Sequence, residues 1–203
     1  MKKIFFGFIL FGLMCSAAFA ENNTFRAYTE NGKEIILFEN GTWQFPEVDS
    51  YQRPKSSKKL VKGKSGLYGI WINDAKWKIM KNTINESAEY SFKHENGDAY
   101  GMIIAERIQM SSVGIRDVAV AHIKEADPDA EIILEENRII NGNDVLCLLI
   151  AAKVQSIQII YYYYFYSGDA GTIQLITYTG QNLFEEYAHD LTSFLNGFVI
   201  LKP

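Results

Sequence analysis

The chain has 203 residues, with 20 basic and 24 acidic side chains and a net charge of −4. The acidic balance and the lack of a lysine or arginine stripe make nucleic acid and anionic lipid poor partners. A chain of this length buries a core without disulfides or metals to staple it.

Residues 1–20 have the pattern of a bacterial signal peptide. Lys2 and Lys3 form a positive start, an apolar run too short to span a bilayer extends to Met14, and small residues precede a cleavage site after Ala20. We expect a periplasmic or secreted mature chain that has no membrane attachment after cleavage. An uncleaved anchor is the alternative.

Residues 21–45 predict a small three-stranded meander. Two Asn-Gly pairs, at 31–32 and 40–41, separate short strand-like runs, and Asn-Gly favours the type I′ turn of a hairpin. A ribbon of this size has little core of its own, so we expect it to dock on something. The side chains available for docking are Phe25, Tyr28, Ile36, Phe38 and Trp43.

Residues 46–66 predict a flexible linker, because they combine low hydrophobicity, two prolines and several serines without any period. The lysines of this segment also fit a basic binding tail, although a solvated connector is the simpler interpretation.

Residues 67–203 predict one α+β domain. Strand-like runs alternate with turn signals, such as Asn96-Gly97 between 88–94 and 99–109. A helix of about a dozen residues follows Ser112, and His122 belongs to its apolar face. A second helix with a wide apolar face begins after Asn182, the predicted N-cap, and carries a solvated polar face.

Four consecutive tyrosines, Tyr161 to Tyr164, lie in a strand that is apolar on both faces. Strands of this kind belong to a sheet that is covered on both sides. We therefore predict an antiparallel sheet of five or more strands covered by helices on both faces, with most of the tyrosines in its core. One helix face plus the docked meander is the alternative covering.

An aromatic groove is the alternative role of these tyrosines. The less aliphatic face would supply its lining, and aromatic walls with few polar groups suit a small amphipathic ligand or an extended peptide. The predicted ligand-binding residues are Tyr162, Tyr164, Tyr166, Tyr178 and Gln174.

The sequence contains no recognisable catalytic or metal-binding set. It lacks a P-loop, a dinucleotide-binding glycine motif and a nucleophile elbow, and its three histidines are not at ligand spacing. The single cysteine beyond the signal segment, Cys147, is expected to be a buried thiol rather than a nucleophile. We predict a chain without enzymatic activity, catalytic residues, metal or cofactor. A site with Glu106 or His122 as acid or base is the enzymatic alternative.

Three resemblances accompany these patterns. The motifs "NGDAY", "MIIAERI", "DPDAEIILEENRIINGNDVLCL", "YYYYFYSGDAGTIQLITYTGQNLFEEY" and "FLNGFV" resemble an uncharacterised family of exported bacterial proteins. The front segment, "TENGKEIILFENGTWQF", resembles a short strand module typified by "DGTW". The element order of residues 68–200 is similar to the PsbP-like (Mog/PsbP) fold, whose known members mostly bind or escort.

These features predict a non-catalytic periplasmic binding or accessory module that contacts a protein or a small amphipathic ligand. A structural or oligomerising protein, whose meander pairs edge to edge between chains, is a further alternative.

Overall fold

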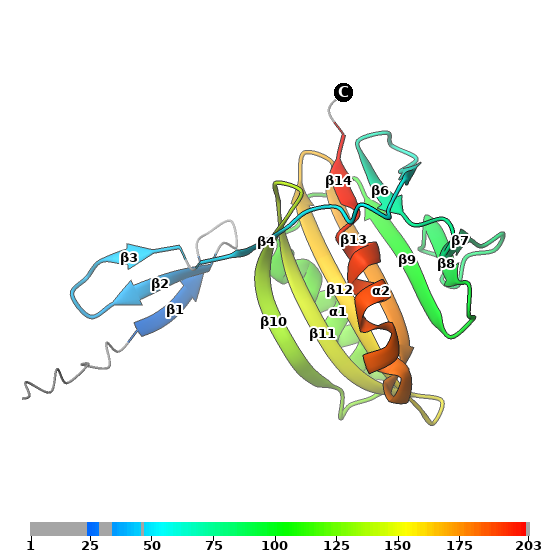
Figure 1. Ribbon diagram of the computed structural model, residues 1–203. Helices are drawn as coiled ribbons and strands as arrows, with labels where there is room; N and C mark the ends of the chain where they lie inside the picture. The colour runs from blue at the N-terminus through cyan, green and yellow to red at the C-terminus, as the bar shows by residue number, and fades with distance from the viewer. Residues whose placement is uncertain (1–23, 29–33, 46, 202–203) are drawn as a thin grey trace, which may run out of the picture.

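A computed structural model describes residues 24–28, 34–45 and 47–201 of the chain (Figure 1). The predicted signal peptide, residues 1–20, lies outside the described residues. Within them, neither helix is long and apolar enough to cross a membrane.

An eight-stranded sheet forms the body of the molecule. Its neighbouring strands run antiparallel, apart from the edge pair β4–β10, which is parallel. In spatial order the strands are β4 (Asp49–Tyr51), β10 (Glu131–Ile140), β11 (Asn143–Val154), β12 (Ile157–Gly168), β13 (Gly171–Gly180), β9 (Ala99–Glu106), β8 (Tyr90–His94) and β7 (Trp77–Ile79).

Two helices and a second sheet complete this body. The second sheet has the order β14 (Phe198–Ile200), β6 (Tyr68–Ile72) and β5 (Lys59–Lys62). The helices are α1 (Ser112–Ala126) and α2 (Phe184–Leu195), and a short 3-10 turn (Gln181–Leu183) leads into α2.

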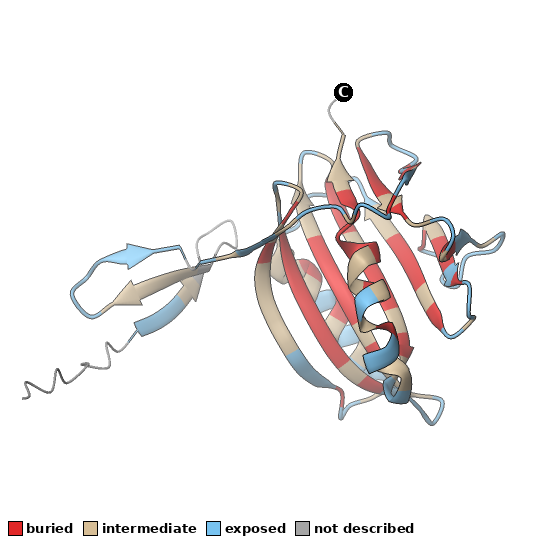
Figure 2. Cartoon of the chain, viewed as in Figure 1, coloured by how far each residue is buried: buried red, intermediate tan, exposed pale blue. Residues whose placement is uncertain are grey.

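The central strands are buried on both faces, as their sequences predict. One core cluster contains Tyr162 and Tyr164 together with side chains of α2 and of β6. The other contains Tyr163 and Phe165 together with side chains of α1. Figure 2 shows the resulting buried band through β11, β12 and β13. The tyrosine strand therefore contributes alternate rings to two separate cores.

The prediction that helices cover both faces is wrong, because the single helix on each face covers only part of the sheet. The large sheet in a mixed α/β chain is confirmed. Each face carries a single helix: α1 contacts β11 and β12, whereas α2 contacts β9, β12, β13 and β6 (Figure 1). An eight-stranded sheet is too wide for one helix. Beside α2 the second sheet completes the cover, since Tyr68, Ile70 and Phe198 belong to the same core cluster.

The segment 46–66 is not a plain linker. It contains β4, which pairs with β10 at Arg138↔Asp49, and β5, which pairs with β6 at Val61↔Ile70. Val61 is buried in the core. The composition of this segment did not predict these two short strands, because edge strands need few apolar residues.

The helix starts also differ from their predictions. The cap of α1 is Ser111, whose Oγ accepts the Gly114 amide at 3.1 Å. Asn182 does not cap α2, because it lies inside the 3-10 turn and Leu183 occupies the cap position.

A separate three-stranded antiparallel sheet contains β1 (Thr24–Tyr28), β2 (Glu34–Phe38) and β3 (Trp43–Gln44), in this order. We call this sheet the meander. Asn40 shapes one of its turns, because its Oδ1 accepts the Thr42 amide at 2.9 Å. In Figure 1 the meander lies away from the large sheet.

Two hairpin turns of the large sheet, β10–β11 and β12–β13, allow a matched test of backbone strain. Gly142 has φ of 82° with open space where a Cβ would lie, whereas Gly171 has φ of 91° and a Cβ there would lie 2.2 Å from the Glu106 carbonyl oxygen. We expect Gly142→Ala to lower the free energy of unfolding by about 1–2 kcal/mol, through positive φ alone. Gly171→Ala should lower it clearly further, because β9 and β13 must also move apart. Urea unfolding compares the two, and equal losses would contradict this packing.

Candidate functional site

The predicted tyrosine groove does not form, because its residues lie on opposite faces of the sheet. Tyr162, Tyr164 and Tyr166 pack in or against the core beneath α2. The strand register pairs Tyr161 with Tyr178 and Phe165 with Gln174, so Tyr178 and Gln174 belong to the face of α1. The pairing register places odd positions of β12 beside even positions of β13, and one sequence does not reveal that register.

Beneath α2, Tyr162 and Tyr164 form a buried polar network around Arg138. The Arg138 Nη1 donates to the Tyr162 hydroxyl at 2.8 Å and to the Tyr164 hydroxyl at 2.9 Å. The Arg138 Nε donates to Glu136 at 2.6 Å, and the Tyr164 hydroxyl donates to the Asn196 side chain at 2.9 Å. Each phenol of this pair is thus partnered, which is what burial requires.

Burial keeps the Tyr162 phenol and the neighbouring Cys147 thiol neutral well above neutral pH. It raises the pKa of Tyr162 to about 12 and the pKa of the Cys147 thiol to about 12. Cys147 is fully buried. A thiol that stays protonated and out of solvent is a poor nucleophile, so Cys147 packs as a small apolar side chain.

The sheet face beneath α1 carries a row of three tyrosines. Of these three, the predicted groove included only Tyr178. Directly paired positions on β9, β13 and β12 bring Tyr100, Tyr178 and Tyr161 together. Tyr100 and Tyr178 stack with ring centroids 5.4 Å apart, and Tyr161 lies 5.4 Å from Tyr178. All three rings are half-buried. The row is a flat aromatic strip rather than a groove.

A polar cavity lies at the exposed side of α2. It has a volume of about 240 Å³ and is lined by Ser56, Ser57, Asn73, Lys76, Trp77, His189, Asp190, Ser193 and Phe194. Three stretches far apart in sequence meet there: the chain before β5, the turn between β6 and β7, and the polar face of α2. The prediction that this helix face is plain solvated surface is therefore wrong for Asp190, whose side chain is only 16% exposed.

Asp190 is the electrostatic centre of this cavity. The Lys76 Nζ donates to both of its carboxylate oxygens, at 2.8 and 2.7 Å. The buried His94 Nε2 lies 3.3 Å from Asp190 Oδ2, but its geometry does not make a hydrogen bond. Sequence reasoning missed this cluster because His94, Lys76 and Asp190 come from β8, a turn and α2, and no local spacing connects them.

The residues of the enzymatic alternative are not assembled into this cavity. Glu106 is the exposed last residue of β9, and His122 is exposed on α1 instead of facing the core. Neither lines the cavity. Among the described residues, no three His, Cys, Asp or Glu side chains form a group that could hold a metal ion.

Comparison with known proteins identifies the fold class. No family model matches the chain, and a search of curated proteins also finds no match. Among solved structures, cyanobacterial PsbP (CyanoP) from Synechocystis matches with a TM-score of 0.54 at 13% identity, over 73% of this chain and 95% of that one. The chain therefore has a PsbP-like fold. At this identity the match defines the architecture and not the activity.

Two further structures have weaker similarity. A protein of unknown function from Pseudomonas aeruginosa matches with a TM-score of 0.45 at 10% identity, over 71% of this chain and 97% of that one. A protein from Bacteroides thetaiotaomicron matches with a TM-score of 0.46 at 9% identity, over 72% of this chain and 49% of that one.

The Arg138 network predicts a large loss of stability when its centre is removed. Arg138→Met leaves two buried phenols without their cationic donor, so we expect the free energy of unfolding to fall by about 2–4 kcal/mol. The matched control is Arg116→Met, which removes a more exposed ion pair with Glu135 at 3.3 Å and should cost less than about 1 kcal/mol. Urea unfolding of both variants measures the difference, and similar losses would contradict a cohesive role for Arg138.

Proposed function

We propose that this chain is an exported, non-catalytic binding or accessory module that contacts a partner protein through its meander. The observation that carries the proposal is the exposure of three large aromatic side chains in and just after this small sheet. Phe25 is 62% exposed, Trp43 is 56% exposed and Phe45 is 53% exposed.

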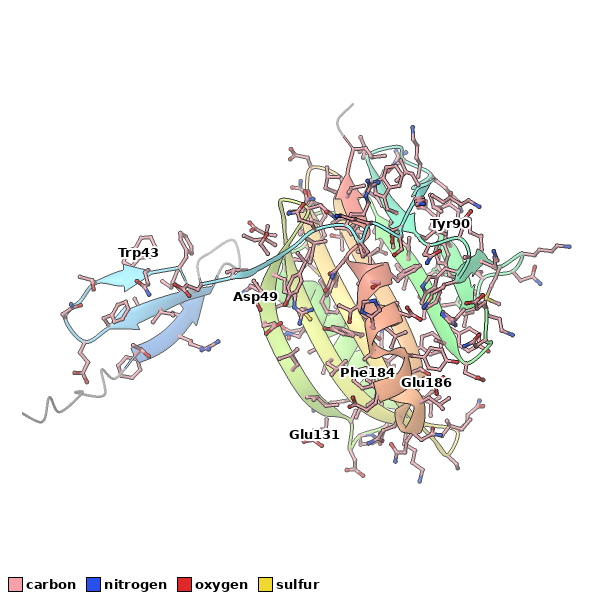
Figure 3. All side chains as sticks on the ribbon, in the orientation of Figure 1. Trp43, Asp49, Tyr90, Glu131, Phe184 and Glu186 are labelled. Carbon is pink, nitrogen blue, oxygen red and sulfur yellow. The ribbon has the colours of Figure 1, made fainter. Side chains whose placement is uncertain are left out.

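Among the described residues of the meander, none buries these rings, because all three side chains stay more than half exposed. Trp43 and Phe45 contact each other edge to face at 5.4 Å, and Ile36 and Phe38 are only half-buried. The side chain of Tyr28 lies outside the described part of the chain. Figure 3 shows Trp43 on the meander, away from the side chains of the large sheet. Clustered exposed aromatic residues are typical of surfaces that bind another protein.

The architecture of the meander favours a role in binding a partner over a purely structural role. A three-stranded sheet without a second layer buries little apolar area, so it gains stability when a partner covers its face. Its main-chain connection to β4 anchors it to the large sheet, because β4 pairs with β10 over Asp49–Tyr51.

Export is part of the proposal. It rests on the positive start, the short apolar run and the small residues before Ala20. A periplasmic location fits the acidic balance, which does not suit nucleic acid as a partner. We further propose that the chain belongs to the exported bacterial family that its quoted motifs resemble. We also propose that its front segment is an example of the "DGTW" strand module.

The proposal predicts that a partner is captured through the meander. A triple variant, Phe25→Ser with Trp43→Ser and Phe45→Ser, should lose a protein that the unaltered chain captures from periplasmic extract. Ile108→Ser with Ile157→Ser is the matched control, because these residues are 69% and 60% exposed but lie outside the meander. Native mass spectrometry of the captured complex measures the result.

Two outcomes would contradict the proposal. One is a clean monomer without any partner under several growth conditions. The other is capture that survives the triple variant unchanged. Cell fractionation tests export separately. A chain that stays uncleaved in the cytoplasm could not contact a periplasmic partner, and this result would contradict export.

A further inference from the structure

We propose that the polar cavity beside α2 binds a small, uncharged, polyhydroxylated molecule of about the size of a monosaccharide. Its volume of about 240 Å³ lies below the range of roughly 300–1,000 Å³ that is common for drug-sized ligands. The occupant is therefore small. The cavity does not include the meander, so this proposal stands apart from the partner protein proposed above.

The charge balance of the cavity favours an uncharged ligand. Lys76 and Asp190 neutralise each other through two short contacts, at 2.8 and 2.7 Å. A carboxylate ligand would have to compete with Asp190 for Lys76, and an ammonium ligand would have to compete with Lys76 for Asp190. A neutral molecule meets neither cost, since it leaves this ion pair intact.

The hydrogen-bonding groups of the lining suit hydroxyl groups. Ser56, Ser57 and Ser193 contribute hydroxyls, each of which can donate and accept. Ser57 is only 3% exposed and forms a buried wall of the cavity. A sugar hydroxyl also donates and accepts, so several such groups on one ligand can each find a partner here.

Asn73 adds a directional donor. Its Oδ1 accepts the Ala75 amide at 3.1 Å, which fixes the side chain in the turn between β6 and β7. No hydrogen bond from its Nδ2 to another described residue is found. The NH₂ group is thus positioned at the cavity and available to a ligand oxygen.

His94 adjoins Asp190 but does not line the cavity. Its side chain is 2% exposed, and its Nε2 has no hydrogen-bond partner among the described residues although Asp190 Oδ2 lies 3.3 Å away. The imidazole therefore lies out of reach of a ligand in the cavity. Trp77 and Phe194, which are 2% and 1% exposed, close the inner wall with rings 4.8 Å apart.

The test is a titration with uncharged sugars and charged counterparts of the same size. Glucose, galactose and N-acetylglucosamine should shift the amide NMR signals of residues 56–57, 73–77 and 189–194, while glucuronate and glucosamine should shift them at least fivefold more weakly at equal concentration. Absence of any shift at about 10 mM sugar would overturn the proposal, because even millimolar affinity is visible there. Stronger shifts with the charged sugars would overturn the uncharged class.

A matched pair of variants separates binding from folding. Asn73→Asp keeps the acceptor for the Ala75 amide but replaces the NH₂ donor with a carboxylate, so it should weaken sugar binding at least fivefold. Asn85→Asp is the control, because the Asn85 Oδ1 accepts the Ser87 amide in the same type of turn at 2.8 Å, away from the cavity. Equal affinities in the two variants would contradict the role of Asn73 and the placement of the ligand.

Discussion

The two-sided burial of β12 is the constraint on which the rest of the structure depends. Tyr162 and Tyr164 face the core beneath α2, whereas Tyr163 and Phe165 face the core beneath α1. Each large side chain that is buried this way contributes roughly 1.5–3 kcal/mol. Both faces of the sheet must therefore be covered, and the two helices and the second sheet supply that cover.

The hydroxyl groups of buried tyrosines need hydrogen-bond partners, and beneath α2 Arg138 is the donor to two of them. One guanidinium contacts Tyr162, Tyr164 and Glu136, and the Asn196 side chain at the end of α2 accepts a hydrogen bond from the Tyr164 hydroxyl. The network thus ties β10, β12 and the end of α2 together. The two proposed recognition sites lie elsewhere, at the exposed rings of the meander and at the small cavity around Asp190.

The sequence predicts what depends on local pattern and misses what depends on register or distant contact. Alternation in β12 correctly predicted two buried faces, because side-chain direction follows position along a strand. The aromatic groove was wrong because the pairing of Tyr161 with Tyr178 depends on turn geometry between strands. The cavity was invisible, since Lys76, His94 and Asp190 meet only after folding. Strands β4 and β5 were missed because their few residues carry almost no apolar signal.

Hydrogen exchange of the backbone amides of β12 tests the central claim most directly. If this strand is buried between two cores, the amides of Tyr162 to Phe165 should exchange only through global unfolding, with the same free energy that urea unfolding gives. The amides of β1 and β2 should exchange much faster. Exchange of the β12 amides at the rate of the meander would mean that one side of the tyrosine strand opens to water, and would contradict the account.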